Sequence, residues 1–253
     1  GGQEHWNFSR SLLFEKTNYM SQICQELYEI AETLDHFGKL LGSELKAVTD
    51  NPQKIDEVIH RVRQLVVPLE NLQVDIFQSI YHPIWETTII DFRDNVDKID
   101  EMTIQFIDDS FDKLRSSEGA FEFLQNFKVM KSRKKIQKQL MEKFSAILNQ
   151  YGREVRKVKG LFETNMTSPP ISISQPQVAG SIAWVRSLYY RIKRPILRFQ
   201  NSRDSLLAKA EGQDACKKYI NVAKAMFEYQ ERLLKEWTSS ISSIVALKLK
   251  DSK

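Results

Sequence analysis

Three aspartates near the middle of the chain have a spacing that could support metal chemistry. Asp108, Asp109 and Asp112 form the pattern D-D-x-x-D. Carboxylates one turn apart on a helix can hold Mg²⁺, which prefers hard oxygen ligands, and the bound ion can then hold a diphosphate. Such a site also needs a second polar cluster on a facing helix. The candidates for it, Asp91, Asp94, Asp97 and Asp100, belong to the same predicted helix, so the sequence favours a solvated acidic face.

Other residues with reactive side chains are too scattered to form a site. The histidines are His5, His36, His60 and His82, and the cysteines are Cys24 and Cys216. No two histidines are three or four apart on one helix, so a zinc site is not expected. Two distant cysteines give no disulfide framework, which favours a reducing compartment. Nucleophile-elbow and phosphate-binding glycine motifs are also absent from the sequence. We therefore expect no enzyme activity, no metal and no cofactor.

Aromatic and arginine side chains alternate in a run near residue 190. One interpretation is structural: Trp184, Leu188 and Ile192 are spaced by four, so they can face a core while the arginines reach solvent. The other is an interaction face, because Trp, Tyr and Arg dominate interface hot spots. The candidate partner-binding residues are Trp184, Arg186, Tyr190, Arg191, Arg194 and Arg198.

The elements that position these residues are predicted to be helices. Hydrophobic residues make up 42% of the 253 residues and charged residues 28%, as in folded proteins. With only 9 Gly and 7 Pro, the chain has too few turn residues for a β-sandwich. Its net charge of +4 is too small to argue for nucleic acid, and no apolar run approaches the roughly 18 residues of a membrane span. The first 30 residues show no secretory signal.

Apolar periodicity predicts an all-α fold of elongated antiparallel helical bundles. The expected helices cover about residues 14–41, 52–68, 83–114, 121–127, 133–163, 181–194 with a continuation past Pro195 to about 210, and 214–249. We expect a first bundle over 1–165, a Pro-rich linker over 166–180, and helices of a next bundle over 181–253.

Two of these helices have the clearest apolar repeats. The first has a coiled-coil seam of two positions per heptad: Met20, Ile23, Leu27, Ile30, Leu34, Phe37 and Leu41. The helix over 133–163 has an eleven-residue rhythm: Ile136, Leu140, Phe144, Ile147, Tyr151, Val155, Val158 and Phe162.

Charge is segregated along the chain. Residues 84–114 contain nine Asp/Glu and three Lys/Arg, a net of 3 − 9 = −6, while residues 128–160 contain eleven Lys/Arg and two Asp/Glu, a net of 11 − 2 = +9. Either these helices are neighbours that neutralise one another, or the basic one presents a face to an acidic partner.

The block Gln175–Ile196, with W-x-R-S-L and R-I-K-x-P-I, resembles the tail region of dynein heavy chains, axonemal more than cytoplasmic. Val185 stands where the family often has Ala. Further blocks resemble the same region in order: 14–24, 44–49, 115–121, 140–144 and 165–170. The resemblance therefore covers about residues 14–200.

This resemblance implies a non-catalytic helical segment of a microtubule motor whose ATPase ring lies elsewhere. Its expected partners are other dynein heavy chains and the intermediate-chain/light-chain complex, and through them the doublet microtubule, with neither nucleic acid nor membrane. The expected location is the cytoskeleton, in the axoneme of a cilium. Two alternatives stay open: a metal-dependent all-α isoprenoid-type enzyme using Asp108, Asp109 and Asp112, and a generic helical scaffold.

Overall fold

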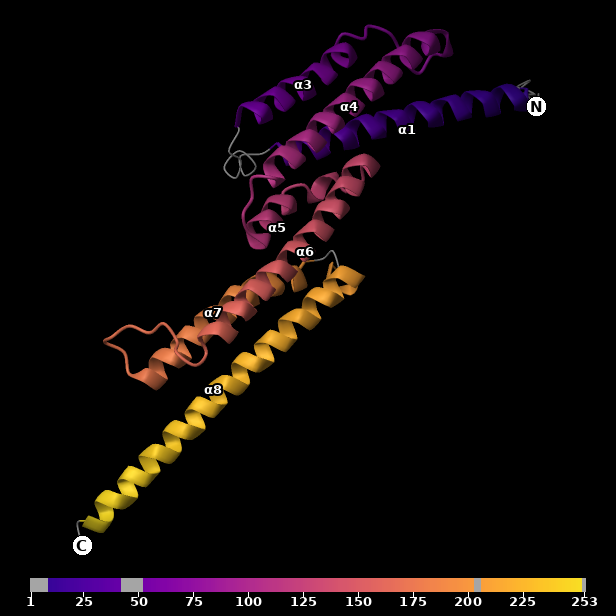
Figure 1. Ribbon diagram of the computed structural model, residues 1–253. Coiled ribbons are helices and arrows are strands. Elements are labelled where there is room, and N and C mark those ends of the chain that lie inside the picture. Colours follow the sequence, from indigo (N-terminus) through magenta and orange to yellow (C-terminus); the bar gives the residue numbers. More distant parts are fainter. Residues whose placement is uncertain (1–8, 42–51, 203–205, 252–253) are drawn as a thin grey trace. The chain divides into compact units, whose positions relative to one another are not determined.

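The computed structural model of the chain describes residues 9–41, 52–202 and 206–251, which are almost entirely helical (Figure 1). The elements are α1 (Arg10–Leu40), α3 (Pro52–Glu70), η1 (Ser79–Tyr81), α4 (His82–Phe111), α5 (Ser117–Gln125), η2 (Lys128–Met130), α6 (Lys134–Asn165), α7 (Gln177–Gln200), η3 (Leu206–Ala208) and α8 (Ala210–Asp251). Since no strand occurs in these described ranges, the all-α prediction is confirmed. His5 and the block 44–49 lie outside them.

The helices group into two compact units. The first contains Gly1–Lys113 and Phe123–Leu140, and the second contains Leu114–Glu122 and Met141–Lys253. The second unit thus joins residues 141–165 to 181–253, which the sequence analysis assigned to different bundles. The division into domains at 165 and 181 stays a prediction.

The first unit is built on α4. Its predicted apolar stripe is buried at every position: Trp85, Ile89, Phe92, Val96, Ile99 and Phe106. Helix α3 lies antiparallel to α4, because Lys54 near the start of α3 pairs with Asp109 near the end of α4. In contrast α1 runs parallel to α4: the rings of Tyr19 and His82 lie 5.1 Å apart, and further along both helices Arg93 bonds Glu29. In chain order α3 comes between α1 and α4 and runs in the opposite direction to both, so the chain returns before α4 begins.

The buried face of α1 is shifted from the predicted seam. Three predicted positions are buried, Ile23, Ile30 and Phe37, but Met20 is 50% exposed and Leu27 is 36% exposed. The second buried column consists instead of Glu26, Thr33 and Leu40. Glu26 is accommodated because its carboxylate accepts a hydrogen bond of 2.5 Å from the buried Trp85 indole.

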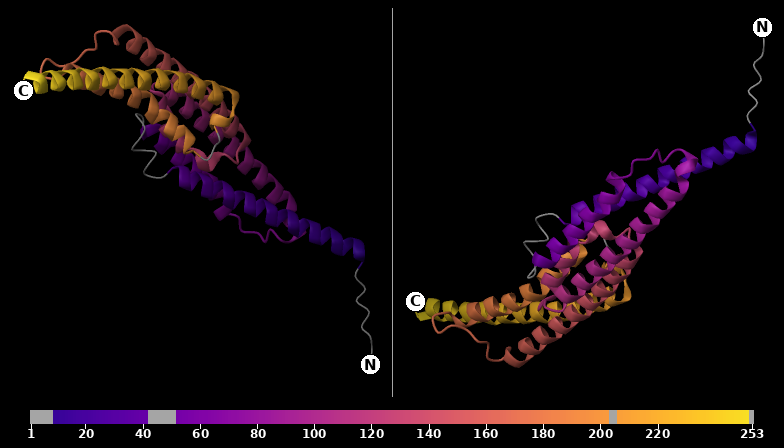
Figure 2. Two further views of the ribbon diagram at one scale, coloured as in Figure 1. Left: turned by 90° about the horizontal axis from the view of Figure 1, so that it is seen from below. Right: turned by 90° about the horizontal axis from the view of Figure 1, so that it is seen from above.

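The second unit is built on α6, α7 and α8. All eight predicted apolar positions of α6 are buried, as the eleven-residue rhythm indicated. Helix α7 lies antiparallel to α6, since the Tyr151 hydroxyl donates to the Ile192 carbonyl at 2.7 Å and Phe162 stacks on Trp184 at 6.2 Å. Helices α7 and α8 lie side by side in all views (Figures 1 and 2).

The ends of the last two helices differ from the prediction. Helix α7 begins at Gln177, inside the predicted linker, and passes through Pro195 to end at Gln200. Pro195 lacks an N–H and removes one helical hydrogen bond, but its ring is buried with the apolar face. Helix α8 begins at Ala210 rather than near 214, directly after η3.

Candidate partner interface

The candidate site lies on α7, whose inner face is held by apolar contacts. That face consists of Val185, Leu188, Ile192, Ile196 and Phe199, all buried. The Phe199 ring meets Phe121 and Tyr151 at centroid distances of 5.1 and 5.5 Å, both edge-on. These positions repeat every three or four residues, and the side chains on the other side of α7, Arg191 and Arg194 among them, are exposed.

Trp184 lies at the flank of this buried face. Its ring is stacked near Phe162 and meets Tyr229 edge-on at 6.5 Å. Its side chain is partly buried, as the spacing with Leu188 predicted. The centre of the core at this level is Val185, which is fully buried. Trp184 therefore has a packing role.

Two of the candidate arginines bind groups within the same unit. Arg186 donates from Nε to the side-chain oxygen of Gln230 on α8 at 3.1 Å. Arg198 pairs with two carboxylates of α5, Glu118 at 2.7 Å and Glu122. These contacts fix α7 against its neighbours, so both side chains are already engaged.

Arg191 and Arg194 are different. Both are exposed, and neither makes a hydrogen bond or ion pair with another residue of the described chain. Helix α7 contains five Arg/Lys and no Asp/Glu, so it offers them no carboxylate of its own. Beside them Tyr190 is 50% exposed, and the Lys193 ammonium lies 5.8 Å from its ring centroid. A planar guanidinium can bind a carboxylate through two parallel hydrogen bonds, so this face suits acidic groups.

The sequence analysis missed an aromatic cluster that adjoins these residues. Tyr189 packs on Phe227 edge-on at 5.0 Å and is stacked near Tyr219 at 6.4 Å. Lys193 lies over the Tyr189 ring at 5.2 Å. These residues come together only because α7 pairs with α8. The one sign of the cluster in the sequence is the adjacent pair Tyr189 and Tyr190. We call Tyr189, Tyr190, Arg191, Lys193, Arg194 and Phe227 the aromatic–basic face.

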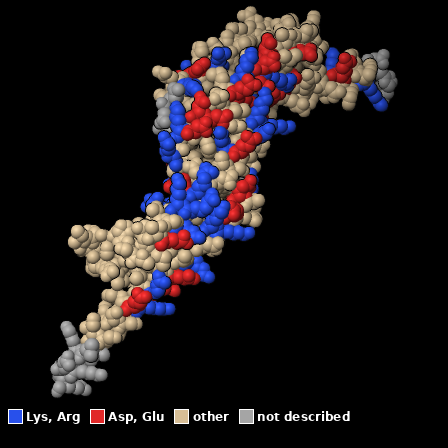
Figure 3. All heavy atoms as spheres, viewed as in Figure 1, with Lys and Arg blue, Asp and Glu red and all other residues tan. Residues whose placement is uncertain are grey.

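Helix α6 adds further exposed cations to this unit. Arg153, Arg156 and Lys157 are exposed and have no ion pair with any described residue. Figure 3 shows Lys and Arg side chains gathered over the middle of α6 and the adjoining end of α7. The second unit therefore carries positive charge that its own carboxylates do not neutralise.

Two of the three aspartates of the D-D-x-x-D pattern, Asp108 and Asp109, are bound by other side chains. Asp108 accepts a hydrogen bond from Gln139, and Asp109 binds Lys54 and accepts from Gln105 at 2.7 Å. The bond from Lys54 is the main reason why the pKa of Asp109 is lowered. Within the described part of the chain, no group of three His, Cys, Asp or Glu has the geometry of a metal site. The arrangement offers no support for magnesium–diphosphate chemistry.

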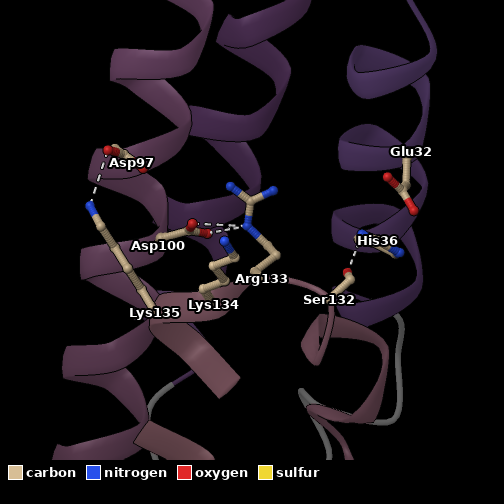
Figure 4. Close-up of a pocket in the computed structure, with 8 residues that line it drawn as sticks. All are labelled: Glu32, His36, Asp97, Asp100, Ser132, Arg133, Lys134 and Lys135. Carbon is tan, nitrogen blue, oxygen red and sulfur yellow. Dashed lines mark hydrogen bonds and ion pairs between the residues drawn. The ribbon is translucent and has the colours of Figure 1, made fainter. Parts of the chain in front are cut away.

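A polar hollow of roughly 350 Å³ in the first unit is lined by residues of α1, of α4 and of the segment that enters α6 (Figure 4). Ser132 lies at its edge with Oγ 3.4 Å from Nδ1 of His36, at the long limit of a hydrogen bond. Arg133 donates from Nε to both oxygens of Asp100, at 2.6 and 2.9 Å, and lies over the Phe37 ring at 5.4 Å. Because Arg133 links α4 to the end of α1, this cluster has a structural role.

The electrostatics of the Asp100–Arg133 pair follow from the burial of the two side chains. Burial raises the pKa of Asp100, and the hydrogen bond and charge of Arg133 partly offset that rise. Next to it, Lys135 pairs with Asp97 at 3.0 Å. Acidic α4 and the basic start of α6 are thus neighbours that neutralise one another, as one interpretation of the charge pattern predicted.

Comparison with known proteins identifies the family. The family described as "Dynein heavy chain, N-terminal region 1" matches residues 1–252. The chain belongs to this dynein heavy chain family. The resemblance found in the sequence is therefore confirmed, and the segment comes from the tail of a motor protein.

The relatives are axonemal and flagellar heavy chains. The chain is 38% identical over 253 residues to "Dynein-1-alpha heavy chain, flagellar inner arm I1 complex" of Chlamydomonas reinhardtii, covering 100% of this chain and 6% of that protein. It is 31% identical over 252 residues to human "Dynein axonemal heavy chain 10", covering 100% of this chain and 4% of that one. The Chlamydomonas "Dynein gamma chain, flagellar outer arm" is 25% identical over 244 residues, 96% of this chain and 5% of that protein. The chain thus spans a small part of the relatives' length.

No helix in the described ranges is both long and apolar enough to cross a lipid bilayer.

Proposed function

We propose that this chain is a non-catalytic tail segment of an axonemal dynein heavy chain. It associates heavy chains and attaches the intermediate-chain/light-chain complex, through which the motor is anchored to the doublet microtubule. Membership of the N-terminal region family supports this role, as do relatives named for flagellar inner and outer arms. The expected location is the cytoskeleton of the ciliary axoneme, and the ATPase belongs to other parts of the motor.

The aromatic–basic face is the observation that carries the proposal. Its two arginines, Arg191 and Arg194, have no counter-charge among the described residues of the chain. A partner that brings carboxylates to them gains charge-assisted hydrogen bonds, each worth roughly 1.5–3 kcal/mol. Tyr190 and Phe227, each about half exposed, supply apolar area beside the charges. This combination is that of an interface hot spot.

The test is a double charge reversal, Arg191→Glu with Arg194→Glu, in the full heavy chain made in a cell that assembles axonemes. Intermediate chains that co-purify with the heavy chain are then quantified. Loss of two charge-assisted contacts predicts a fall in affinity of at least about tenfold, since about 1.4 kcal/mol corresponds to one decade. The matched control is Arg61→Glu with Arg63→Glu, two exposed arginines of α3, which should leave co-purification unchanged.

Two results would contradict the proposal. Full retention of intermediate chains by the α7 double variant would mean that these arginines are only solvated. A loss of stability of about 3–5 kcal/mol, the usual cost of truncating a large aromatic side chain in a core, would mean that they are internal structural groups.

A further inference from the structure

The segment between α6 and α7 is open and lies mostly in solvent. It covers residues 166–176 and contains no helix. Figures 1 and 2 show it as a loop at the end of the α6–α7 pair. Most of its side chains are exposed, and that of Ile173 is fully exposed at a turn. An enzyme that modifies protein side chains can therefore reach this segment.

The segment is attached on both sides of one exposed serine, Ser168. Before it, the Met166 carbonyl accepts a hydrogen bond of 3.0 Å from the Tyr229 hydroxyl. After it, the backbone N–H of Ile171 donates to the Pro169 carbonyl at 2.9 Å. Ser168 itself is exposed, and neither its backbone nor its hydroxyl is hydrogen-bonded to another described residue. Its hydroxyl is free to react.

Ser168 is the only serine or threonine in the sequence that is followed by proline. The ring of Pro169 disfavours helical dihedral angles at the preceding residue, so Ser168 is restricted to extended conformations. Protein kinases bind their acceptor segment in extended form. One class of Ser/Thr kinases requires proline directly after the acceptor, because its pocket offers no partner for an N–H at that position, and proline has none.

The surroundings of Ser168 exclude recognition by charge. No charged residue occurs between Glu163 and Arg186. Kinases that recognise arginine or acidic side chains next to the acceptor therefore find no such group here. Pro169 is the recognition feature that remains. A phosphate on Ser168 would bring a charge of about −1.5 to −2 at pH 7 into a stretch that has none.

Two other serines of the same segment provide a comparison. Ser172 and Ser174 are also exposed, but they are followed by Ile173 and Gln175. Their hydroxyls are hydrogen-bonded to one another at 3.0 Å. If exposure alone decided modification, all three serines would react; recognition of proline selects Ser168.

We propose that Ser168 is a phosphorylation site for a proline-directed Ser/Thr kinase. In this step the Ser168 hydroxyl oxygen bonds to the γ-phosphorus of ATP, and the bond from that phosphorus to the β–γ bridging oxygen breaks. The hydroxyl proton passes to the catalytic base of the kinase, and ADP leaves. Because Ser168 is exposed and already extended, binding to the kinase requires only the release of Met166 from Tyr229.

Phosphorylation of the full heavy chain in vitro tests the proposal, with a mitogen-activated protein kinase as the proline-directed enzyme and Mg²⁺–ATP as the phosphoryl donor. Phosphopeptides are quantified by mass spectrometry, and a synthetic peptide of residues 162–174 gives the rate for an unfolded acceptor. We expect Ser168 to react at most about tenfold more slowly than the peptide, which is the factor that one hydrogen bond can contribute. Tyr229→Phe, which removes that bond, should bring the two rates together. Ser172 and Ser174 should take up at least about tenfold less phosphate.

The matched control is Pro169→Ala, which keeps the serine but removes the recognition feature, and it should abolish phosphorylation of Ser168. Three results overturn the proposal: no phosphate on Ser168 of the heavy chain, equal phosphate on Ser172 or Ser174, and unchanged phosphorylation of Ser168 in the Pro169→Ala variant.

A second measurement uses dynein isolated from cilia in the presence of phosphatase inhibitors. Its heavy chain should contain the Ser168 phosphopeptide, which phosphatase treatment should remove, and absence of this phosphopeptide also overturns the proposal. None of these measurements depends on the binding of intermediate chains, so their failure leaves the proposed function unaffected.

Discussion

Replacing Gly212 with alanine tests how closely the start of α8 approaches the preceding turn. An alanine Cβ at this position would lie 2.3 Å from the Leu206 carbonyl oxygen and 2.5 Å from the Leu207 Cα. Both contacts are far below van der Waals distance, and both partners are backbone atoms that cannot rotate away. Either η3 or the first turn of α8 must therefore shift.

The size of the effect follows from two opposing terms. Overpacking in a tight site costs typically 1–3 kcal/mol, and a backbone clash this short belongs at the upper end. Alanine is favoured over glycine inside a helix by up to about 1 kcal/mol, which offsets part of that cost. The expected net loss is about 2 kcal/mol. For a chain of this size that lowers the melting temperature by about 4–8 °C.

The control is Gly160→Ala in α6, where nothing lies within 4 Å of the added Cβ. This substitution changes only the helix propensity, in favour of alanine, and should raise the melting temperature by about 2–4 °C. Thermal unfolding of the three proteins, followed by circular dichroism at 222 nm, makes the comparison. The reasoning is refuted if Gly212→Ala is as stable as the wild type or gains as much as Gly160→Ala.

Two further predictions concern buried polar groups. Burial raises the pKa of the Tyr151 phenol, so it stays neutral in the folded chain while the unfolded chain ionises near pH 10. Stability should accordingly fall as the pH rises above about 10. Tyr151→Phe should reduce that slope in denaturant titrations between about pH 8 and 11, and cost about 1 kcal/mol at neutral pH for the lost bond to Ile192. Arg133→Met leaves the buried Asp100 carboxylate unpaired and should cost about 3–5 kcal/mol at pH 7. That deficit should shrink as the pH is lowered towards about 4, because Asp100 then takes up a proton; a pH-independent deficit would contradict the assignment.

The sequence predicted the buried positions of a helix correctly where large apolar residues recur along its whole length. In α4 and α6 every apolar position that the periodicity predicted is buried, although the buried face of α4 also contains Asp100 and Thr103. The second buried column of α1 contains Glu26 and Thr33, and their burial depends on Trp85 and Arg133, which come much later in the chain. No local pattern can reveal partners at such distances, and the seam was placed one residue away.

The candidate interface was predictable in composition but not in detail. The alternation of aromatics and arginines marked α7, and the partly buried Trp184 was expected. Which arginines remain available depends on α5 and α8, because Arg198 binds Glu118 and Arg186 binds Gln230. The apolar period of α8 predicts that Trp237, Ile241 and Ile244 are buried, but they are 40–54% exposed, so this part of the sequence prediction is wrong.

The parallel pairing of α1 with α4 has a consequence for the order of folding. Helices α3 and α4 form a hairpin from adjacent segments, whereas α1 is held by contacts such as Glu26–Trp85, 59 residues apart, and Thr33–Arg133, 100 residues apart. Non-local contacts form late, because long loops must close first. On the ribosome, Phe37 is made 133 − 37 = 96 residues before the Arg133 that covers it. At about 5–20 residues per second, the Phe37 ring waits roughly 5–20 s for this partner, so we expect α1 to complete its packing after the α3–α4 hairpin has formed.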